Sequence, residues 1–156
     1  ILMQHPIDSA HSVVLMTSLC LVGINFKQTY MDTKKLFCLE QIAPYYKDPN
    51  TCGFDGINCC YLTSDGKMCV LGKNLIDPGS FEAGWNCEQV IETEKDRPVL
   101  KPEVRGILTT DEWQLLQYIH DVIAQVHHLS DYLKTLSDKC SKYNLFTLQE
   151  LQDYCT

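Results

Sequence analysis

The chain has 156 residues, of which 45% are hydrophobic and 21% are charged, and its formal net charge is −7. This length and composition predict one globular domain with a hydrophobic core and exclude an intrinsically disordered chain. Lys and Arg are scattered, which argues against nucleic-acid binding because phosphate backbones require a basic surface. The acidic balance favours solubility and, where it serves recognition, a protein partner with a basic surface.

Residues 1–30 form an apolar segment that allows three interpretations. Residues 9–26 contain no Asp, Glu, Lys or Arg, but no Lys or Arg precedes them and no small-residue cleavage site follows. As a membrane span the run is short and interrupted by polar residues. The segment is upstream sequence before a start at Met31, an export or membrane-anchor segment, or a structural element. We therefore expect a single domain over residues 31–156, with secretion or membrane anchoring as alternatives that depend on residues 9–26.

The first expected helix begins near Asp32 and ends at the turn residues 47–50. An apolar stripe at spacings of three and four residues indicates it, formed by Leu36, Phe37, Leu39, Ile42, Ala43 and Tyr46. Pro44 lies inside this pattern, which predicts a kink or an early end of the helix.

Residues 59–72, with the sequence CCYLTSDGKMCVLG, predict a β-hairpin. Two short apolar runs flank the turn dipeptide Asp65-Gly66, in which glycine accepts the positive φ that a tight turn requires. A two-residue loop would place Cys69 opposite Leu62. A four-residue loop would place it opposite Cys60 and make a cross-strand cysteine pair natural. Residues 77–106 are interpreted as an irregular excursion with a short strand at 89–91.

The C-terminal third predicts three helices. Thr109 with Glu112 and Thr147 with Glu150 have the spacing of capping boxes for the first and the last of them, and Asn144 can end the middle one. The first helix carries an apolar face of Leu115, Leu116, Ile119, Val122, Ile123 and Val126. The predicted fold class is therefore α+β and mostly helical, with a small antiparallel hairpin or sheet packed against three to four helices.

The nine cysteines leave three chemical states open. No C-x-x-C pair occurs, although zinc ribbons normally depend on that spacing. Setting Cys20 aside with its apolar segment leaves eight cysteines, which would suit a disulfide framework in an exported protein. Reduced cysteines packed as small apolar residues are the favoured state. If the chain binds zinc, the expected ligands are Cys59, Cys69 and His120.

His120, next to Asp121, is expected to be a hydrogen-bonded structural histidine. It lies seven residues from His127, which is two helical turns or roughly 10 Å, so the two cannot share one metal ion. A nucleophilic pair of His120 with Cys59, Cys60 or Cys69 is less favoured, because a hairpin cysteine has no helix dipole to stabilise its thiolate. We therefore assign no catalytic residue and no cofactor, with zinc as the alternative, and we do not expect an enzyme.

Two motifs of the chain carry a resemblance. The first reads Cys59-x-Tyr61-x-x-x-Asp65-Gly66-x-x-Cys69-x-x-Gly72 and is closed by Leu75-Ile76, and the second is L-Q-x-x-H-D at residues 116–121. Both resemble a family of small uncharacterised proteins of bacteriophages and bacteria. The sequence pattern of that family is C-x-Y, then DG, then C-A-x-G-x-L-I. The similarity covers roughly residues 31–145. The chain departs from the pattern at Leu62 and Val70, and it has extra cysteines: Cys52, Cys60, Cys87 and Cys140.

The resemblance implies a cytoplasmic accessory protein of phage type that begins near Met31 and acts through protein contacts. The family carries no activity that could be transferred. The candidate functional residues are those of the two motifs: Cys59, Tyr61, Asp65, Gly66, Cys69, Gly72, His120 and Asp121. A secreted protein stapled by disulfides and a small zinc-binding domain remain the alternatives.

Overall fold

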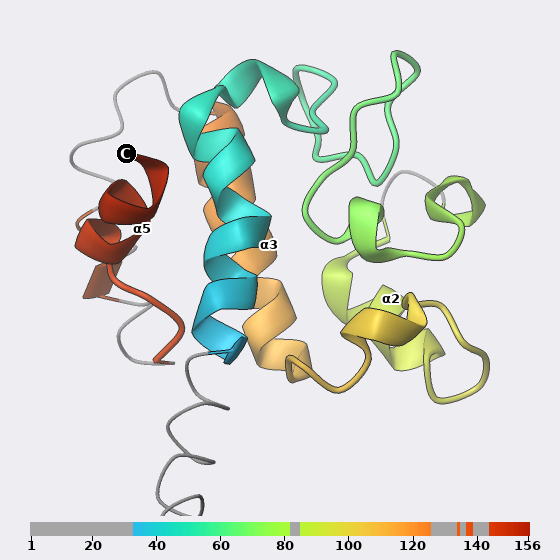
Figure 1. The fold of residues 1–156 in the computed structure, drawn as a ribbon. Helices are drawn as coiled ribbons and strands as arrows, with labels where there is room; N and C mark the ends of the chain where they lie inside the picture. Colours follow the sequence, from blue (N-terminus) through green and yellow to red (C-terminus); the bar gives the residue numbers. More distant parts are fainter. Residues whose placement is uncertain (1–32, 82–84, 126–133, 135–136, 139–143) are drawn as a thin grey trace, which may run out of the picture. The chain divides into compact units, whose positions relative to one another are not determined.

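The computed structural model describes residues 33–81, 85–125, 134, 137–138 and 144–156 (Figure 1). Residues Lys34–Thr156 form one compact unit. Its longer helices are a helix over residues 33–47, α2 (Cys87–Thr93), α3 (Thr110–Gln125) and α5 (Leu148–Cys155). Short 3-10 helices connect them: η1 (Pro49–Thr51), η2 (Gly72–Asn74), η3 (Pro78–Ser80) and η4 (Pro102–Val104).

The predicted α+β fold is wrong. The described part of the chain is mostly helical and contains no β-strand, hairpin or sheet. Strand-like pairing is limited there to isolated bridges between Cys52 and Met68, between Phe54 and Cys59, and between Leu75 and Leu100.

The predicted turn at Asp65-Gly66 does form, but no hairpin follows from it. Gly66 has a φ of 85°, and the backbone N–H of Thr63 donates to the carbonyl of Lys67 over 2.8 Å. Away from the turn, the N–H of Cys60 donates to Gly53 instead, and the N–H of Lys73 donates to Cys69 as the chain coils into η2. The two apolar runs do not pair as strands. They are short, and other segments take the backbone hydrogen bonds that a second strand would need.

The strand predicted at residues 89–91 is also wrong, because these residues lie within α2. Asn86 caps this helix: its side chain accepts from the N–H of Gln89, and the Gln89 side chain accepts from the N–H of Asn86. The capping pair stabilises a helix of only seven residues inside a segment rich in proline and glycine.

The first helix runs from residue 33 to residue 47 and passes through Pro44, so the early end predicted there is wrong. Pro44 has no N–H to donate to the carbonyl of Glu40, but its own carbonyl accepts the N–H of Asp48 over 3.0 Å, so the helix continues through its last turn. The stripe is also rotated relative to the prediction, since Leu36 is 47% exposed whereas Cys38 and Tyr45 are buried.

This helix lies alongside α3 and runs in the same direction (Figure 1). Lys34 contacts Glu112 near the start of both helices, the rings of Phe37 and Trp113 meet edge to face at 6.0 Å, and Tyr45 meets His120 further along. The predicted apolar face of α3 is confirmed, with Leu115, Leu116, Ile119, Val122 and Ile123 buried. The hydrophobic core therefore lies between these two helices and the segments packed on them.

Both capping boxes predicted in the C-terminal third are confirmed. The side chains of Thr109 and Glu112 exchange hydrogen bonds with each other's backbone N–H at the start of α3, and those of Thr147 and Glu150 do so at the start of α5. Asn144 has a positive φ of 55°, as expected for a helix-ending residue.

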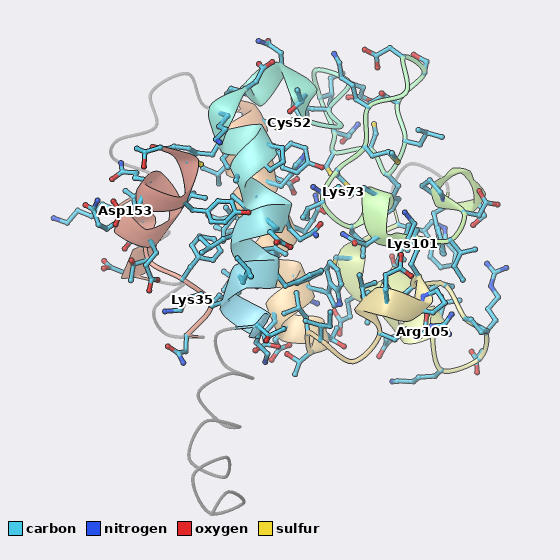
Figure 2. All side chains as sticks on the ribbon, viewed as in Figure 1. Lys35, Cys52, Lys73, Lys101, Arg105 and Asp153 are labelled. Carbon is cyan, nitrogen blue, oxygen red and sulfur yellow. The ribbon has the colours of Figure 1, made fainter. Side chains whose placement is uncertain are left out.

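Lysine side chains hold the segment after residue 68 against the first helix (Figure 2). Nζ of Lys73 donates to the carbonyl of Gln41 over 2.9 Å, and Nζ of Lys101 donates to the carbonyl of Lys73 over 2.7 Å. Burial lowers the pKa of Lys73 to about 8. The bond from Lys73 fixes the segment after residue 68 against the helix over residues 33–47, and the bond from Lys101 ties residues 73 and 101 together.

Several predictions fall outside the described residues, namely those on residues 1–30, on most of the helix before Asn144, on Val126 and on His127. Within the described part of the chain, no helix combines the length and the apolar character that a membrane span requires.

Candidate functional site

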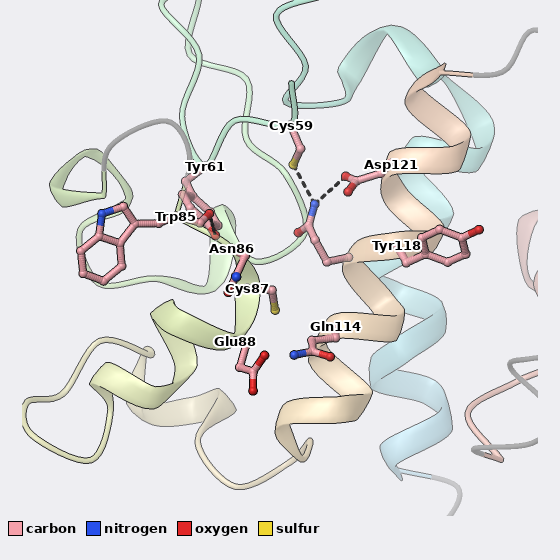
Figure 3. A pocket seen from close by; sticks show the side chains of 10 residues that line it. Cys59, Tyr61, Trp85, Asn86, Cys87, Glu88, Gln114, Tyr118 and Asp121 are labelled. Atoms are coloured by element: carbon pink, nitrogen blue, oxygen red, sulfur yellow. Dashed lines mark hydrogen bonds between the residues drawn. The ribbon is translucent and has the colours of Figure 1, made fainter. Parts of the chain in front are cut away.

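Three side chains of the second motif lie on one side of α3. Gln117, His120 and Asp121 are three and four residues apart, which places them on the same helical face. Figure 3 shows Asp121 of this face turned toward the segment that carries Cys59. The L-Q-x-x-H-D spacing and the cysteine motif therefore meet in space.

The amide of Gln117 lies at the centre of this cluster. Its Oε1 accepts the backbone N–H of Leu71 over 3.2 Å, which directs Nε2 toward the other members. Nε2 donates to Sγ of Cys59 over 2.7 Å and to Oδ1 of Asp121 over 2.8 Å, as the dashed lines of Figure 3 show. It also lies 3.3 Å from Nδ1 of His120. Gln117 thus joins the two motifs directly.

His120 is completely buried, and its Nδ1 faces the cluster. Nδ1 lies 3.0 Å from Oδ1 of Asp121 and 3.9 Å from Sγ of Cys59. The ring of Tyr45 packs perpendicular to the imidazole with the centroids 4.6 Å apart. Nε2 of His120 is buried and has no hydrogen-bond partner among the described residues. The carboxylate of Asp121 therefore selects the tautomer that carries the proton on Nδ1.

Cys69 lies behind Cys59 and is completely buried. Its Sγ accepts the backbone N–H of Gly72 over 3.3 Å. Gly72 itself packs against the backbone of Tyr61, where a Cβ would overlap the Tyr61 carbonyl. The glycine of the motif is thus required by a close approach of two backbones rather than by a positive φ.

The thiols of Cys59 and Cys69 influence each other, and their pKa values are shifted in opposite directions. The neighbouring Cys69 is the main cause that raises the pKa of Cys59, and burial and the charge of Asp121 raise it further. Burial opposes ionisation of Cys69, but the neighbouring Cys59 and the N–H of Gly72 outweigh it and lower the pKa of Cys69. Negative charge in this pair is therefore favoured on the buried sulfur.

A pocket of about 370 Å³ opens next to the cluster (Figure 3). It is lined by residues 59 and 61, by residues 85–88 at the start of α2, and by Gln114, Gln117, Tyr118 and Asp121 of α3. Glu88 and Asp121 supply carboxylates, and no Lys or Arg is among these lining residues. The pocket gives small molecules and ions a path to Cys59 and Asp121.

The structure gathers most of the candidate residues, but not all of them. Cys59, His120 and Asp121 meet, and Cys69 lies on the adjacent segment, where its N–H donates to the carbonyl of Cys60 and its Sγ accepts the N–H of Gly72. The Tyr61 hydroxyl supports the segment by donating to the carbonyl of Trp85 over 2.8 Å. Asp65 and Gly66 do not join the cluster. They lie in an exposed turn, where Asp65 pairs with Thr63 and with Lys67.

The grouping that could hold a metal ion differs from the ligand set predicted from the sequence. Its atoms come from Cys59, His120 and Asp121, all within 4.8 Å of one another, so Asp121 takes the place expected for Cys69. Gln117 was not predicted as a functional residue, although its spacing to His120 and Asp121 places the three on one helical face. Tyr45 was missed because its position indicated only a helix.

Of the cysteines that the structure describes, none is joined in a disulfide; they are Cys38, Cys52, Cys59, Cys60, Cys69, Cys87 and Cys155. Burial raises the pKa of Cys52 and of Cys87 to about 12 in each case, so neither is a reactive thiol at neutral pH.

Compared with protein-family models, with curated proteins and with solved structures, the chain gives no match. Function is therefore argued from the site alone.

Proposed function

We propose that the protein binds a zinc ion beside this pocket, through Sγ of Cys59, Nδ1 of His120 and Oδ1 of Asp121. The observation that carries the proposal is the grouping of these three atoms, from two separate parts of the chain, within 4.8 Å of one another. Thiolate, imidazole and carboxylate are the ligand types of zinc, whereas magnesium and calcium prefer oxygen ligands alone.

The distances between the ligand atoms support a small, tetrahedral ion. Zinc with ordinary bond lengths holds such atoms about 3.3–3.6 Å apart. The distance from Nδ1 of His120 is 3.0 Å to Oδ1 of Asp121 and 3.9 Å to Sγ of Cys59, and all three atoms lie within 4.8 Å of one another, so zinc binding would draw the sulfur toward the other two ligands. Three protein ligands leave a fourth position open, and Cys59 and Asp121 both line the pocket from which water or a ligand would fill it.

Gln117 occupies the place that the ion would take. Its Nε2 lies 2.7, 2.8 and 3.3 Å from the ligand atoms of Cys59, Asp121 and His120, so zinc binding requires the amide to turn away. It also requires the proton of His120 to move from Nδ1 to Nε2, because only an unprotonated ring nitrogen binds a metal ion. The buried N–H of Leu71 then loses its acceptor, at a cost of about 1–3 kcal/mol. We therefore expect zinc to bind more weakly here than at a site whose ligands are open.

The direct test is the zinc content of the purified full chain, measured by elemental analysis and by calorimetric titration of the metal-free protein with zinc. We expect one zinc per chain. The variants Cys59→Ser and Asp121→Asn should weaken binding by at least about 100-fold, since even outer partners of zinc ligands contribute about 10- to 100-fold. Cys60→Ser is the matched control, because its sulfur points to the carbonyl of Asn58. Absence of stoichiometric zinc, or unchanged binding by both ligand variants, would contradict the proposal.

Two glutamines of α3 provide a second comparison. Gln117→Ala removes the amide that competes with zinc, so it should bind zinc about 10-fold more tightly, given the cost of about 1–3 kcal/mol for displacing it. Gln114→Ala, one turn away on the same pocket, should leave the affinity unchanged. Equal affinities of the two variants would show that Gln117 does not occupy the ion's position.

A second candidate is a nucleophilic role for Cys59, which the nearby imidazole and the pocket favour. It is weaker, because Nδ1 of His120, which would take the thiol proton, also donates to Asp121. The neighbouring Cys69, burial and the charge of Asp121 also raise the pKa of Cys59. This candidate predicts that iodoacetamide labels Cys59 of the metal-free protein faster than Cys155 at pH 7. The zinc proposal predicts slow labelling and further protection by zinc.

An accessory role through protein contacts, implied by the family resemblance, is compatible with a zinc site and stays a prediction. Its support is the acidic balance of the chain, with a net charge of −7. Co-purification of a basic partner that is lost at high salt would test it.

A further inference from the structure

The pocket beside the cluster carries charge of one sign only. Its lining includes the carboxylates of Glu88 and Asp121 and no Lys or Arg. A hollow lined by charges of one sign concentrates counter-ions, so a ligand of this pocket should be cationic. The volume of about 370 Å³ has room for a small organic molecule and is larger than a single ion needs.

Both carboxylates can accept hydrogen bonds from a ligand. Glu88 is exposed and forms no hydrogen bond or ion pair with any other residue that the structure describes. Oδ1 of Asp121 faces Gln117 and His120, and the Asp121 side chain stays 29% exposed. Its second oxygen can therefore accept a donor from the pocket.

The two carboxylates lie at opposite ends of the pocket. Asp121 follows Gln114 by seven residues along α3, which is two turns or roughly 10 Å. Figure 3 shows Glu88 at the same end as Gln114, and Asp121 at the other end near Cys59. Carboxylates so far apart cannot coordinate one ion together, because metal–oxygen bonds are only about 2.0–2.6 Å long. Each carboxylate would therefore take a positive charge of its own.

The wall between these ends offers a surface for an aliphatic chain. Cys87 lies there in Figure 3 and is buried at the surface of the pocket. Burial raises the pKa of Cys87 to about 12, so its thiol is neutral at pH 7. A neutral thiol packs as a small apolar group against the methylenes of a ligand.

We propose that this pocket binds a linear aliphatic diamine, with one ammonium group on Glu88 and the other on Asp121. A chain of about four carbons, as in putrescine, places the two nitrogens roughly 6 Å apart, and a charged hydrogen bond of about 2.8 Å at each end lets the molecule span the pocket. The inference goes beyond the zinc proposal, because it requires the pocket and not the ion.

The diamine and zinc would share Asp121. A bound zinc ion occupies Oδ1 of this carboxylate and repels an ammonium group, so zinc should weaken diamine binding. The two proposals can still fail separately. Diamine binding is measured on metal-free protein, and the zinc content is measured without the diamine.

The experiment is a calorimetric titration of the metal-free full chain with putrescine, at low salt and in a buffer without amines. We expect one putrescine per chain. Butylamine has one ammonium group, like a lysine side chain of a partner protein, and should bind at least about 10-fold more weakly. Butanediol has no charge and should not bind. Because these comparisons use the wild type, they do not depend on any variant being folded.

Two glutamates of α2 then locate the site. Glu88→Gln should weaken putrescine binding at least about 10-fold, because it removes the charge at one end of the pocket. Glu92→Gln is the matched control and should keep the affinity within about twofold, since Glu92 lies outside the pocket and pairs with Lys95 at 3.5 Å. No saturable binding of putrescine, equal binding of butylamine, or equal affinities of the wild type and Glu88→Gln would overturn the proposal.

Discussion

At the scale of single residues, Gln117 and Gly72 show what the two sequence motifs require. The side-chain amide of Gln117 forms hydrogen bonds at both ends: its oxygen accepts the N–H of Leu71, and its nitrogen donates to Cys59 and Asp121. Gly72 gives the backbone of Tyr61 the room to pass close by. Neither residue is reactive: Gln117 contacts Cys59 and His120, and the N–H of Gly72 donates to Sγ of Cys69.

The glycine can be tested against a neighbour of the same type. Gly72→Ala should destabilise the protein by about 2–3 kcal/mol, because its Cβ would overlap backbone atoms of Tyr61 that have little freedom to move. Gly79→Ala should change the stability by less than about 0.5 kcal/mol, since its Cβ would meet Oδ1 of Asp77 at 3.5 Å, an ordinary contact. Urea unfolding followed by circular dichroism measures both. Equal stability of the two variants would contradict the close approach at Gly72.

At the scale of elements, the first turn of the helix over residues 33–47 contacts the starts of two other helices. Lys34 pairs with Glu112 at 2.8 Å, and Lys35 pairs with Glu150. Both glutamates also complete capping boxes, at the starts of α3 and α5. Adjacent lysines of one helix thus contact the glutamates that cap the other two helices.

Glu112→Gln should lower the free energy of unfolding by about 1–3 kcal/mol at pH 7, because it removes a charged hydrogen bond to Lys34. Burial opposes the charge on Glu112, but the hydrogen bonds from Lys34 and from the N–H of Thr109 outweigh it and lower its pKa below the usual 4.5. A carboxyl group of this kind stabilises the fold above its unfolded pKa, and the effect is lost as the pH falls through its folded pKa.

The difference in stability between the wild type and Glu112→Gln should therefore be full at pH 7 and should shrink below a pH of about 4.5. Urea unfolding at pH 7, 5, 4 and 3 measures it. Glu40→Gln on the first helix is the control and should cost less than about 0.5 kcal/mol, because Glu40 is exposed. A difference that stays constant down to pH 3 would show that the charge of Glu112 is not involved.

At the scale of the whole molecule, residues Lys34–Thr156 form one compact unit that includes every described core residue. A chain that begins at Met31 should therefore unfold within about 2 °C of the full chain, because it keeps the first helix and its contacts. A chain that begins at Leu39 lacks Lys34, Lys35 and Phe37 and should lose at least about 5 °C. Thermal unfolding of the three chains measures this, and a large loss in the Met31 chain would show that residues 1–30 stabilise the domain.

Local patterns determined part of this protein from the sequence alone. The capping boxes at Thr109 and Thr147, the buried face of α3 and the turn at Gly66 were all predicted and are confirmed, because each depends on hydrogen bonds or packing between residues a few positions apart. The hairpin and the strand at residues 89–91 were predicted by the same local reasoning and are wrong. The hydrogen bond that the N–H of Cys60 donates to the carbonyl of Gly53 and the cap at Asn86 decide those segments instead.

The sequence also provided the candidate functional residues, because the two motifs of the resemblance contain Cys59, Cys69, His120 and Asp121. Only the tertiary structure decided how they meet: Asp121 rather than Cys69 completes the set of possible metal ligands, and the Gln117 amide lies at its centre. The physical reason is chain separation. Cys59 and His120 are 61 residues apart, so their distance depends on how α3 packs against the cysteine segment, and no local pattern specifies that packing.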